Sequence, residues 1–228
     1  MNEIMLFVEI MLFVEIVLFF SLILLIKKTI GKSGLFAWIG IATVLAEIQV
    51  TKCVTIFGIS ATLGNVLFAS NFLVTDILRE CYSQEDAKKG VLISALGGLF
   101  FILFSIITPV FIPNEFDFTH DSLKVVLSLT PRITTSSILM LIIANYSDVF
   151  IYDFLHKKFK GKKMWLRNNI STIFCNCLEN FFFTFLAFWN MYSISELLMI
   201  AVSTSIIETL IALCDTPFLY LAKKISNK

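Results

Sequence analysis

Long apolar runs constrain this chain more than any other feature of its sequence. Several of them exceed the roughly 18 consecutive apolar residues that mark a candidate membrane-spanning helix. We distinguish seven runs, at about 4–26, 35–56, 60–78, 90–112, 122–147, 169–190 and 196–221. Hydrophobic residues make up 57% of the 228 residues, whereas soluble domains average about 45–50%. The sequence therefore predicts a polytopic membrane protein and excludes a large soluble core.

Helices are the expected spanning form, because lipid offers no partner to an unpaired backbone N–H or C=O group. The apolar runs are continuous and do not alternate, which disfavours a β-barrel. The expected fold class is therefore an all-α membrane bundle with about seven transmembrane segments. Residues 1–31, which contain a tandem copy of EIMLFV, form an N-terminal helix, and residues 32–228 form the main bundle. Only FGIS separates the second and third runs, which predicts a tight helical hairpin or a re-entrant pair.

Basic residues indicate the orientation of this bundle, because Lys and Arg concentrate in cytoplasmic loops. Four segments contain 15 of the 18 basic residues, namely 27–34, 79–89, 156–168 and the tail 223–228. The connection 112–121 instead contains three acidic residues and no Lys or Arg. Seven spans with the N-terminus outside place all four basic segments on the cytoplasmic side. We therefore expect a multi-pass protein of the cell membrane with a cytoplasmic C-terminus.

Polar residues inside the apolar runs are the candidate functional residues. The stretch FLVTDILREC (72–81) places Asp76 after the nearly uncharged segment 54–72. A charge at the centre of a membrane helix costs about 2.5–3.5 kcal/mol on insertion scales, so it needs a partner or a watery cavity. Asn65, Phe72 and Asp76 fall on one stripe of a helix, and Asn176, Glu179 and Asn180 share the face of another. These spacings predict a polar cavity inside the bundle.

Further charged residues enter the runs from other segments. They are Glu47, Lys52, Arg132, Glu208 and Asp215. Pro131 loosens the helix beside Arg132, because it removes a backbone donor. Lys52, Arg132, Glu208 and Asp215 are the candidates for a gate or for ion pairs. A purely structural ion pair and a role in a ligand pathway both stay open for Arg132.

The cavity chemistry suits a flat ring that forms hydrogen bonds. A carboxylate can accept two adjacent N–H groups, and Phe or Trp can stack on a ring. Sugars and amino acids would also suit such a cavity. The sequence has no HExxH, Walker, GxSxG or paired CxxC motif, so we expect neither an enzyme nor a cofactor. Cys175 and Cys177 point to different helix faces without a nearby His, so no metal site is expected.

Several stretches together resemble the queuosine precursor transporter family, also called the vitamin uptake transporter family. They are IQVTK (48–52), FLVTDILRE (72–80), PRITTSSILMLIIANYSDVFIYDFL (131–155), WLRNNISTIF (165–174) and DTPFLYLAK (215–223). The resemblance runs from about residue 32 to the C-terminus and implies a six-helix family core after the N-terminal helix. It also implies import of 7-deazaguanine bases, such as 7-cyano- or 7-aminomethyl-7-deazaguanine or queuine, for queuosine in transfer RNA.

The positions that match the family motifs are Lys52, Asp76, Arg132, Asp148, Arg167, Asn168, Asn169 and Asn176. Glu179 stands where the family usually has Asp, Glu208 where we expect Lys, and Asn71 where a small or hydroxyl residue is usual. For such a transporter we expect Asn176 and Glu179 to bind the edge of the base, with Asn65, Phe72 and Asp76 as further binding residues. We also expect Asp76 and Arg132 to form a gate or an ion pair in the cavity.

Three functions remain in competition. The first is a transporter that imports a queuosine precursor by rocking around a central site. The second is a substrate-binding membrane subunit that works with a separate ATPase module, and the third is an intramembrane enzyme. The expected partners are a small deazaguanine and the lipid bilayer, with no direct contact to nucleic acid. A homo-oligomer is left open.

Overall fold

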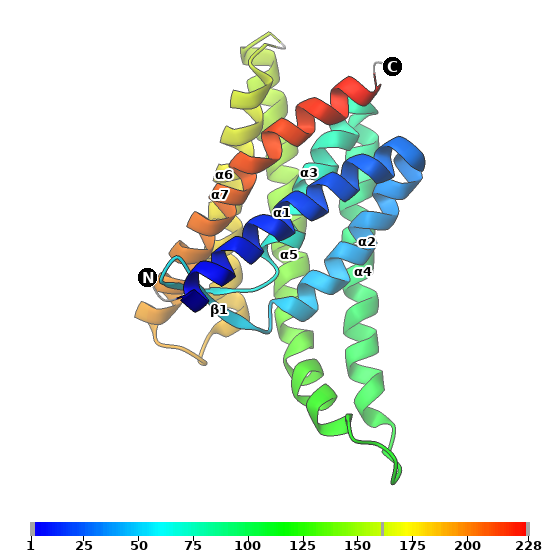
Figure 1. Cartoon of the computed structure of the whole chain (residues 1–228), viewed down its shortest axis with the longest axis vertical. Coiled ribbons are helices and arrows are strands. Elements are labelled where there is room, and N and C mark those ends of the chain that lie inside the picture. Colours follow the sequence, from blue (N-terminus) through cyan, green and yellow to red (C-terminus); the bar gives the residue numbers. More distant parts are fainter. Residues whose placement is uncertain (1–2, 161, 227–228) are drawn as a thin grey trace.

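The computed structural model describes residues 3–160 and 162–226 of the chain (Figure 1). The described residues form seven α-helices, one for each predicted apolar run. They are α1 (Glu3–Thr29), α2 (Lys32–Gln49), α3 (Asn65–Cys81), α4 (Gln84–Ile107), α5 (His120–Lys158), α6 (Met164–Phe188) and α7 (Ile194–Ser226). A short 3-10 helix (Thr108–Val110) extends α4. The predicted all-α bundle is confirmed.

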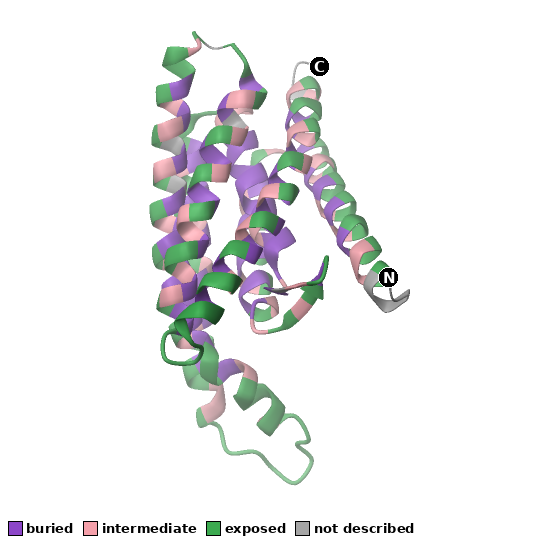
Figure 2. Cartoon of the chain, turned by 90° about the vertical axis from the view of Figure 1, so that its left-hand side faces the viewer, coloured by how far each residue is buried: buried purple, intermediate pink, exposed green. Residues whose placement is uncertain are grey.

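Five helices, α1, α4, α5, α6 and α7, are long and apolar enough to cross a membrane. Helices α2 and α3 are shorter, with 18 and 17 residues. At a rise of 1.5 Å per residue they span about 26 Å, slightly less than the ~30 Å hydrocarbon core. Helix α5 has 39 residues and is about 58 Å long. Consequently the α4–α5 hairpin projects beyond the other helices and is mostly exposed (Figure 2).

Helix α3 lies at the centre of the bundle and contacts α1, α2, α4 and α7. Thirteen of its 17 residues are buried. Leu73 and Ile77 pack with Ile207 of α7 and with Phe20 of α1 in one apolar core. Because α3 is enclosed by other helices, its polar residues Asn65 and Asp76 are kept away from lipid.

The connection between α2 and α3 differs from the sequence-based expectation. It is a β-hairpin in which β1 (Cys53–Ile56) pairs antiparallel with β2 (Ile59–Thr62). Phe57 and Gly58 form its two-residue turn with φ of 52° and 76°, as in the type I′ turns that favour hairpins. The predicted tight helical hairpin is therefore wrong. The β-branched residues around this turn suit extended backbone better than a helix.

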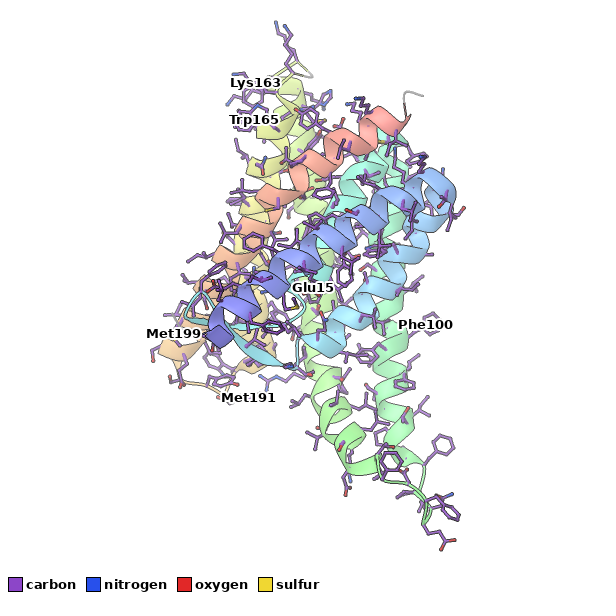
Figure 3. All side chains as sticks on the ribbon, in the orientation of Figure 1. Glu15, Phe100, Lys163, Trp165, Met191 and Met199 are labelled. Atoms are coloured by element: carbon purple, nitrogen blue, oxygen red, sulfur yellow. The ribbon has the colours of Figure 1, made fainter. Side chains whose placement is uncertain are left out.

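The four basic segments lie at one end of the bundle. The α1–α2, α3–α4 and α5–α6 connections and the C-terminus share this end, whereas the acidic α4–α5 loop, the β-hairpin and the α6–α7 turn lie toward the other (Figure 1). Lys163 and Trp165 mark the first end, and Met191 and Met199 mark the second (Figure 3). We call these the basic end and the hairpin end. Seven spans with alternating connections predict this separation of the basic segments from the acidic loop. The cytoplasmic location of the basic end stays a prediction.

This orientation predicts different chemical access to the two ends. We expect a cysteine at Asn114→Cys, in the exposed α4–α5 loop, to react with a membrane-impermeant maleimide in intact cells. A cysteine at Lys162→Cys, in the α5–α6 loop, should react only after permeabilisation. The five native cysteines, all free thiols, would first be replaced by Ser or Ala. The opposite labelling pattern would reverse the orientation.

Candidate functional site

Polar side chains gather in two places inside the bundle, and the first lies toward the basic end. Arg79 of α3 is its centre, with a side chain that is only 5% exposed. The guanidinium donates to Asp148 Oδ2 of α5 at 3.0 Å and pairs with Asp76, one turn earlier in α3. It also lies 3.6 Å from the centre of the Tyr152 ring. A buried cation between two carboxylates therefore joins α3 to α5.

The same cluster includes α6 and α7. Glu80 accepts hydrogen bonds from the Tyr152 hydroxyl and from Lys223 Nζ of α7, the latter at 2.6 Å. Arg167 of α6 lies 3.9 Å from Glu80 and 4.8 Å from the centre of the Tyr152 ring. We name Asp76, Arg79, Glu80, Asp148, Tyr152, Arg167 and Lys223 the inner charge cluster. It holds four helices together at the basic end.

The second polar region is a cavity between the inner charge cluster and the hairpin end. Helices α3, α5, α6 and α7 and the β-hairpin form its walls. Its lining residues are Val50, Thr62, Asn65, Phe68, Ser137, Glu179, Asn180, Phe183, Thr184, Phe188, Ile200, Thr204 and Glu208. We name it the polar cavity. In this conformation the volume open to the centre of a water molecule is about 20 Å³. This is room for about one water molecule.

Three polar atoms on the cavity wall have no hydrogen-bond partner in the described part of the chain. They are Glu179 Oε2, Asn65 Nδ2 and Thr204 Oγ1. Native proteins leave few such atoms unsatisfied, and each one requires an explanation. Glu208, on the same wall, accepts a hydrogen bond from Asn180 Nδ2. The cavity thus presents a free acceptor, a free donor and a hydroxyl group to any solute that enters it.

A wider vestibule adjoins the polar cavity at the hairpin end. The volume open to the centre of a water molecule is about 250 Å³ in the vestibule. Its lining includes Cys53, Tyr192 and Glu196. Thr62, Phe188 and Ile200 belong to both spaces. The Phe188 ring packs edge-on against Phe183, with 5.9 Å between ring centres. These shared side chains separate the cavity from the vestibule.

The structure brings together only some of the predicted binding residues. Asn65 and Glu179 line the polar cavity, as does Glu208, which was predicted as a gate or ion-pair residue. Phe72 and Asn176 are buried but are not part of the cavity wall. Asp76 belongs instead to the inner charge cluster, where Asp215 is its electrostatic neighbour. The predicted stripe on α3 is therefore divided between the two polar regions.

The predicted ion pair between Asp76 and Arg132 does not form. Arg132 is exposed, and its guanidinium donates to the backbone oxygens of Leu186 and Trp189 at 3.2 and 2.7 Å. It thereby satisfies carbonyl groups at the C-terminus of α6, where a cation is favourable. Arg132 precedes Asp148 by 16 residues on α5, which is about 24 Å along the helix axis, so it cannot reach the same cluster.

Lys52, another predicted gate residue, is exposed in the turn before β1. Among the residues that the structure describes, none forms a salt bridge with Lys52. Its backbone oxygen accepts a hydrogen bond from the Leu63 amide at 2.7 Å. Its backbone amide donates to the Gln49 oxygen at the end of α2 at 2.9 Å.

Sequence reasoning missed several residues of the two regions. Arg79 was assigned to a loop, although it follows Asp76 by three residues and so faces the same way on a helix. Tyr152 follows Asp148 by four residues, and Thr204 precedes Glu208 by four, so the same spacing rule indicates both. Phe188 and Thr62 gave no such signal, because the hairpin and the end of α6 meet only in the folded chain.

Removal of the Arg79 charge should destabilise the protein strongly. Arg79→Met leaves Asp76 and Asp148 buried without their cation, and loss of one partner of a buried pair costs about 3–5 kcal/mol. We expect a corresponding fall in thermal unfolding temperature in detergent. Lys88→Met is the control, because its pair with Glu85 is exposed and contributes less than about 1 kcal/mol. Equal effects of both substitutions would contradict a central role for Arg79.

Comparisons with known proteins identify the family of this chain. Residues 62–222 match a family model described as "Putative vitamin uptake transporter". The chain is 37% identical over 204 residues to a protein of Bacillus subtilis (strain 168) described as "Probable queuosine precursor transporter", with 88% of each chain covered. No solved structure matches this chain. The resemblance predicted from the sequence motifs is confirmed, and the chain belongs to the vitamin uptake transporter family.

Proposed function

We propose that this chain imports a queuosine precursor, a 7-deazaguanine base, across the cell membrane. The observation that carries the proposal is the polar cavity, where Glu179 Oε2 and Asn65 Nδ2 are buried without a hydrogen-bond partner among the described residues. The description of the Bacillus subtilis relative as a queuosine precursor transporter supports the same substrate class. Membrane transporters commonly bind their substrate near the middle of the bilayer. The polar cavity is therefore the expected binding site.

The proposed binding mode uses the hydrogen-bonding edge of the base. The Glu179 carboxylate accepts the ring N–H and the exocyclic amine side by side, since one carboxylate can accept two such donors. The unpartnered Asn65 amide donates to the carbonyl oxygen of the base. Phe183 and Phe188 offer ring faces or edges to the flat bicycle. Asn176 lies one turn from Glu179 toward the basic end and has a buried, unpartnered oxygen, which suits a second contact on the inward route.

The two polar regions suggest how access alternates. Thr62, Phe188 and Ile200 stand between the cavity and the vestibule, so they form the barrier on the hairpin side. The inner charge cluster forms the barrier on the basic side, because its paired side chains fill the space between four helices. The cavity must widen to admit a base, since it now has room for about one water molecule. Relative movement of α6 and α7 would widen it, as these helices supply both glutamates.

Uptake by cells tests the proposal directly. The host would lack both its own synthesis of the base and its own importer, and it would express this chain alone. We expect uptake of labelled 7-aminomethyl-7-deazaguanine and the return of queuosine to transfer RNA. Transport by the purified chain in liposomes would exclude a required ATPase partner. Chemical conversion of the base by the purified protein would instead favour the hypothesis that the chain is an intramembrane enzyme.

Glu179→Gln should weaken binding of the base. The substitution replaces one of the two acceptors with a donor, and a hydrogen bond to a charged group contributes about 1.5–3 kcal/mol. We expect affinity to fall by about 10- to 100-fold, measured as ligand-dependent thermal stabilisation. The matched control is Glu85→Gln at the exposed start of α4, which should leave affinity unchanged.

A base without the exocyclic amine offers Glu179 only one donor. A 7-deazahypoxanthine analogue should therefore bind wild-type protein about 10- to 100-fold more weakly than the guanine-type base. The same analogue should lose little further affinity on Glu179→Gln. If both bases bind wild-type protein equally well, the carboxylate does not contact this edge. The proposed function itself fails if no deazaguanine stabilises the protein and none is taken up.

A further inference from the structure

The wall of the polar cavity contains two acidic side chains and, among the described residues, no Lys or Arg. Glu179 of α6 and Glu208 of α7 are both on its wall. Glu47 of α2 lies behind them, 1% exposed, and accepts a hydrogen bond from Thr134 at 2.9 Å. Both Glu47 and Glu208 are electrostatic neighbours of Glu179. Within the described ranges, no salt bridge joins any of the three to a Lys or Arg.

Among the described residues, the elements around the cavity place no Lys or Arg on its wall. Helix α3 contributes Asn65 and Phe68, α5 contributes Ser137, and the hairpin contributes Thr62, all uncharged. Arg132 of α5 is exposed and bonds to the end of α6. The lack of a Lys or Arg beside the two glutamates is thus a property of the whole described wall, and not of one helix.

The inner charge cluster shows that the chain pairs three other buried or partly buried carboxylates with cations. Asp76 and Asp148 contact Arg79, and Glu80 contacts Lys223. The described part of the same protein therefore contains buried carboxyl groups that are paired with cations and, in the cavity, glutamates that are not. A purely structural explanation of the cavity glutamates would have to account for the absence of similar pairing there.

Two carboxyl groups that share a buried site oppose each other's ionisation, and a cation that enters the site stabilises their ionised forms. The aromatic wall favours the same kind of ligand, since an organic cation is attracted to the face of a Phe ring. Phe68, Phe183 and Phe188 all line the cavity. A neutral ligand would use the hydrogen bonds but would bring no cation to the second glutamate.

We infer that the polar cavity selects a base with a cationic amine, with the base edge on Glu179 and the ammonium group at Glu208. The inference rests on the proposed function and specifies its substrate class: a 7-deazaguanine with a protonated amine on the 7-substituent. Glu179 suits the two-donor edge because its Oε2 is unpartnered. Glu208 suits the ammonium, because Asn180 already orients its carboxylate and a compact point charge needs no bidentate geometry.

Two bases that differ at the 7-substituent test this inference. The amine of 7-aminomethyl-7-deazaguanine is protonated at neutral pH, as a lysine amine is, whereas 7-cyano-7-deazaguanine is neutral. We expect the wild-type chain in lipid nanodiscs to bind the aminomethyl base about 10- to 100-fold more tightly, as a charge-assisted contact would give. Equal affinities, or tighter binding of the cyano base, would overturn the inference.

Variants of Glu208 then assign the preference to this residue. Glu208→Gln should lower affinity for the aminomethyl base much more than for the cyano base, so the ratio of the two affinities falls close to one. Glu208→Lys should favour the cyano base. The matched control is Glu115→Gln in the exposed α4–α5 loop, which removes the same charge from the molecule and should keep the wild-type ratio. Thermal unfolding without ligand checks that each variant is folded.

The outcomes separate this inference from the proposed function. If both bases bind and are transported but the ratio does not depend on Glu208, only the selection of a cation is wrong. If neither base binds wild-type protein, the proposed function is wrong, and the assignment of Glu208 falls with it.

Discussion

Exclusion of charged side chains from hydrocarbon is the constraint on which the rest of this structure depends. A charged group at the membrane centre is costly unless it is paired or hydrated, and this chain places such groups on α2, α3, α5, α6 and α7. Helix α3 carries Asp76 and Arg79 and is enclosed by other helices (Figure 2). The arrangement of long apolar helices around a short polar one follows from this requirement.

The chain meets the constraint in two different ways along the membrane axis. Toward the basic end, Arg79, Arg167 and Lys223 neutralise carboxylates, and the resulting network fastens four helices. Toward the hairpin end, Glu179 and Glu208 line a cavity whose described wall contains no Lys or Arg. A paired network resists separation and suits a barrier, whereas unpaired polar atoms favour a ligand. In the proposed transport cycle, the paired network is the barrier and the cavity is the binding site.

Sequence patterns predicted the apolar scaffold well, because continuous hydrophobic runs and the basic loops depend on local composition. The positions of the polar residues were harder to predict from the sequence. Helical spacing indicated Asn65 and Glu179, but Phe72 and Asp76 share the stripe of Asn65 and lie outside the cavity wall, because the stripe extends farther than the cavity. The predicted ion pair between Arg132 and Asp76 was wrong, because the sequence alone does not show how far one helix is shifted along another. The β-hairpin was missed because short apolar strands resemble the ends of helices.

The sequence by itself determined that this chain is a membrane bundle, that its basic segments share one end, and that its family is that of the vitamin uptake transporters. These properties depend on composition, parity and local motifs, which need no knowledge of packing. The tertiary structure alone decided that Arg79 and not Arg132 neutralises Asp76, and that Glu179 and Glu208 face one cavity. Such pairings depend on how far each helix is shifted along its neighbours, and the packing of the whole bundle sets that shift.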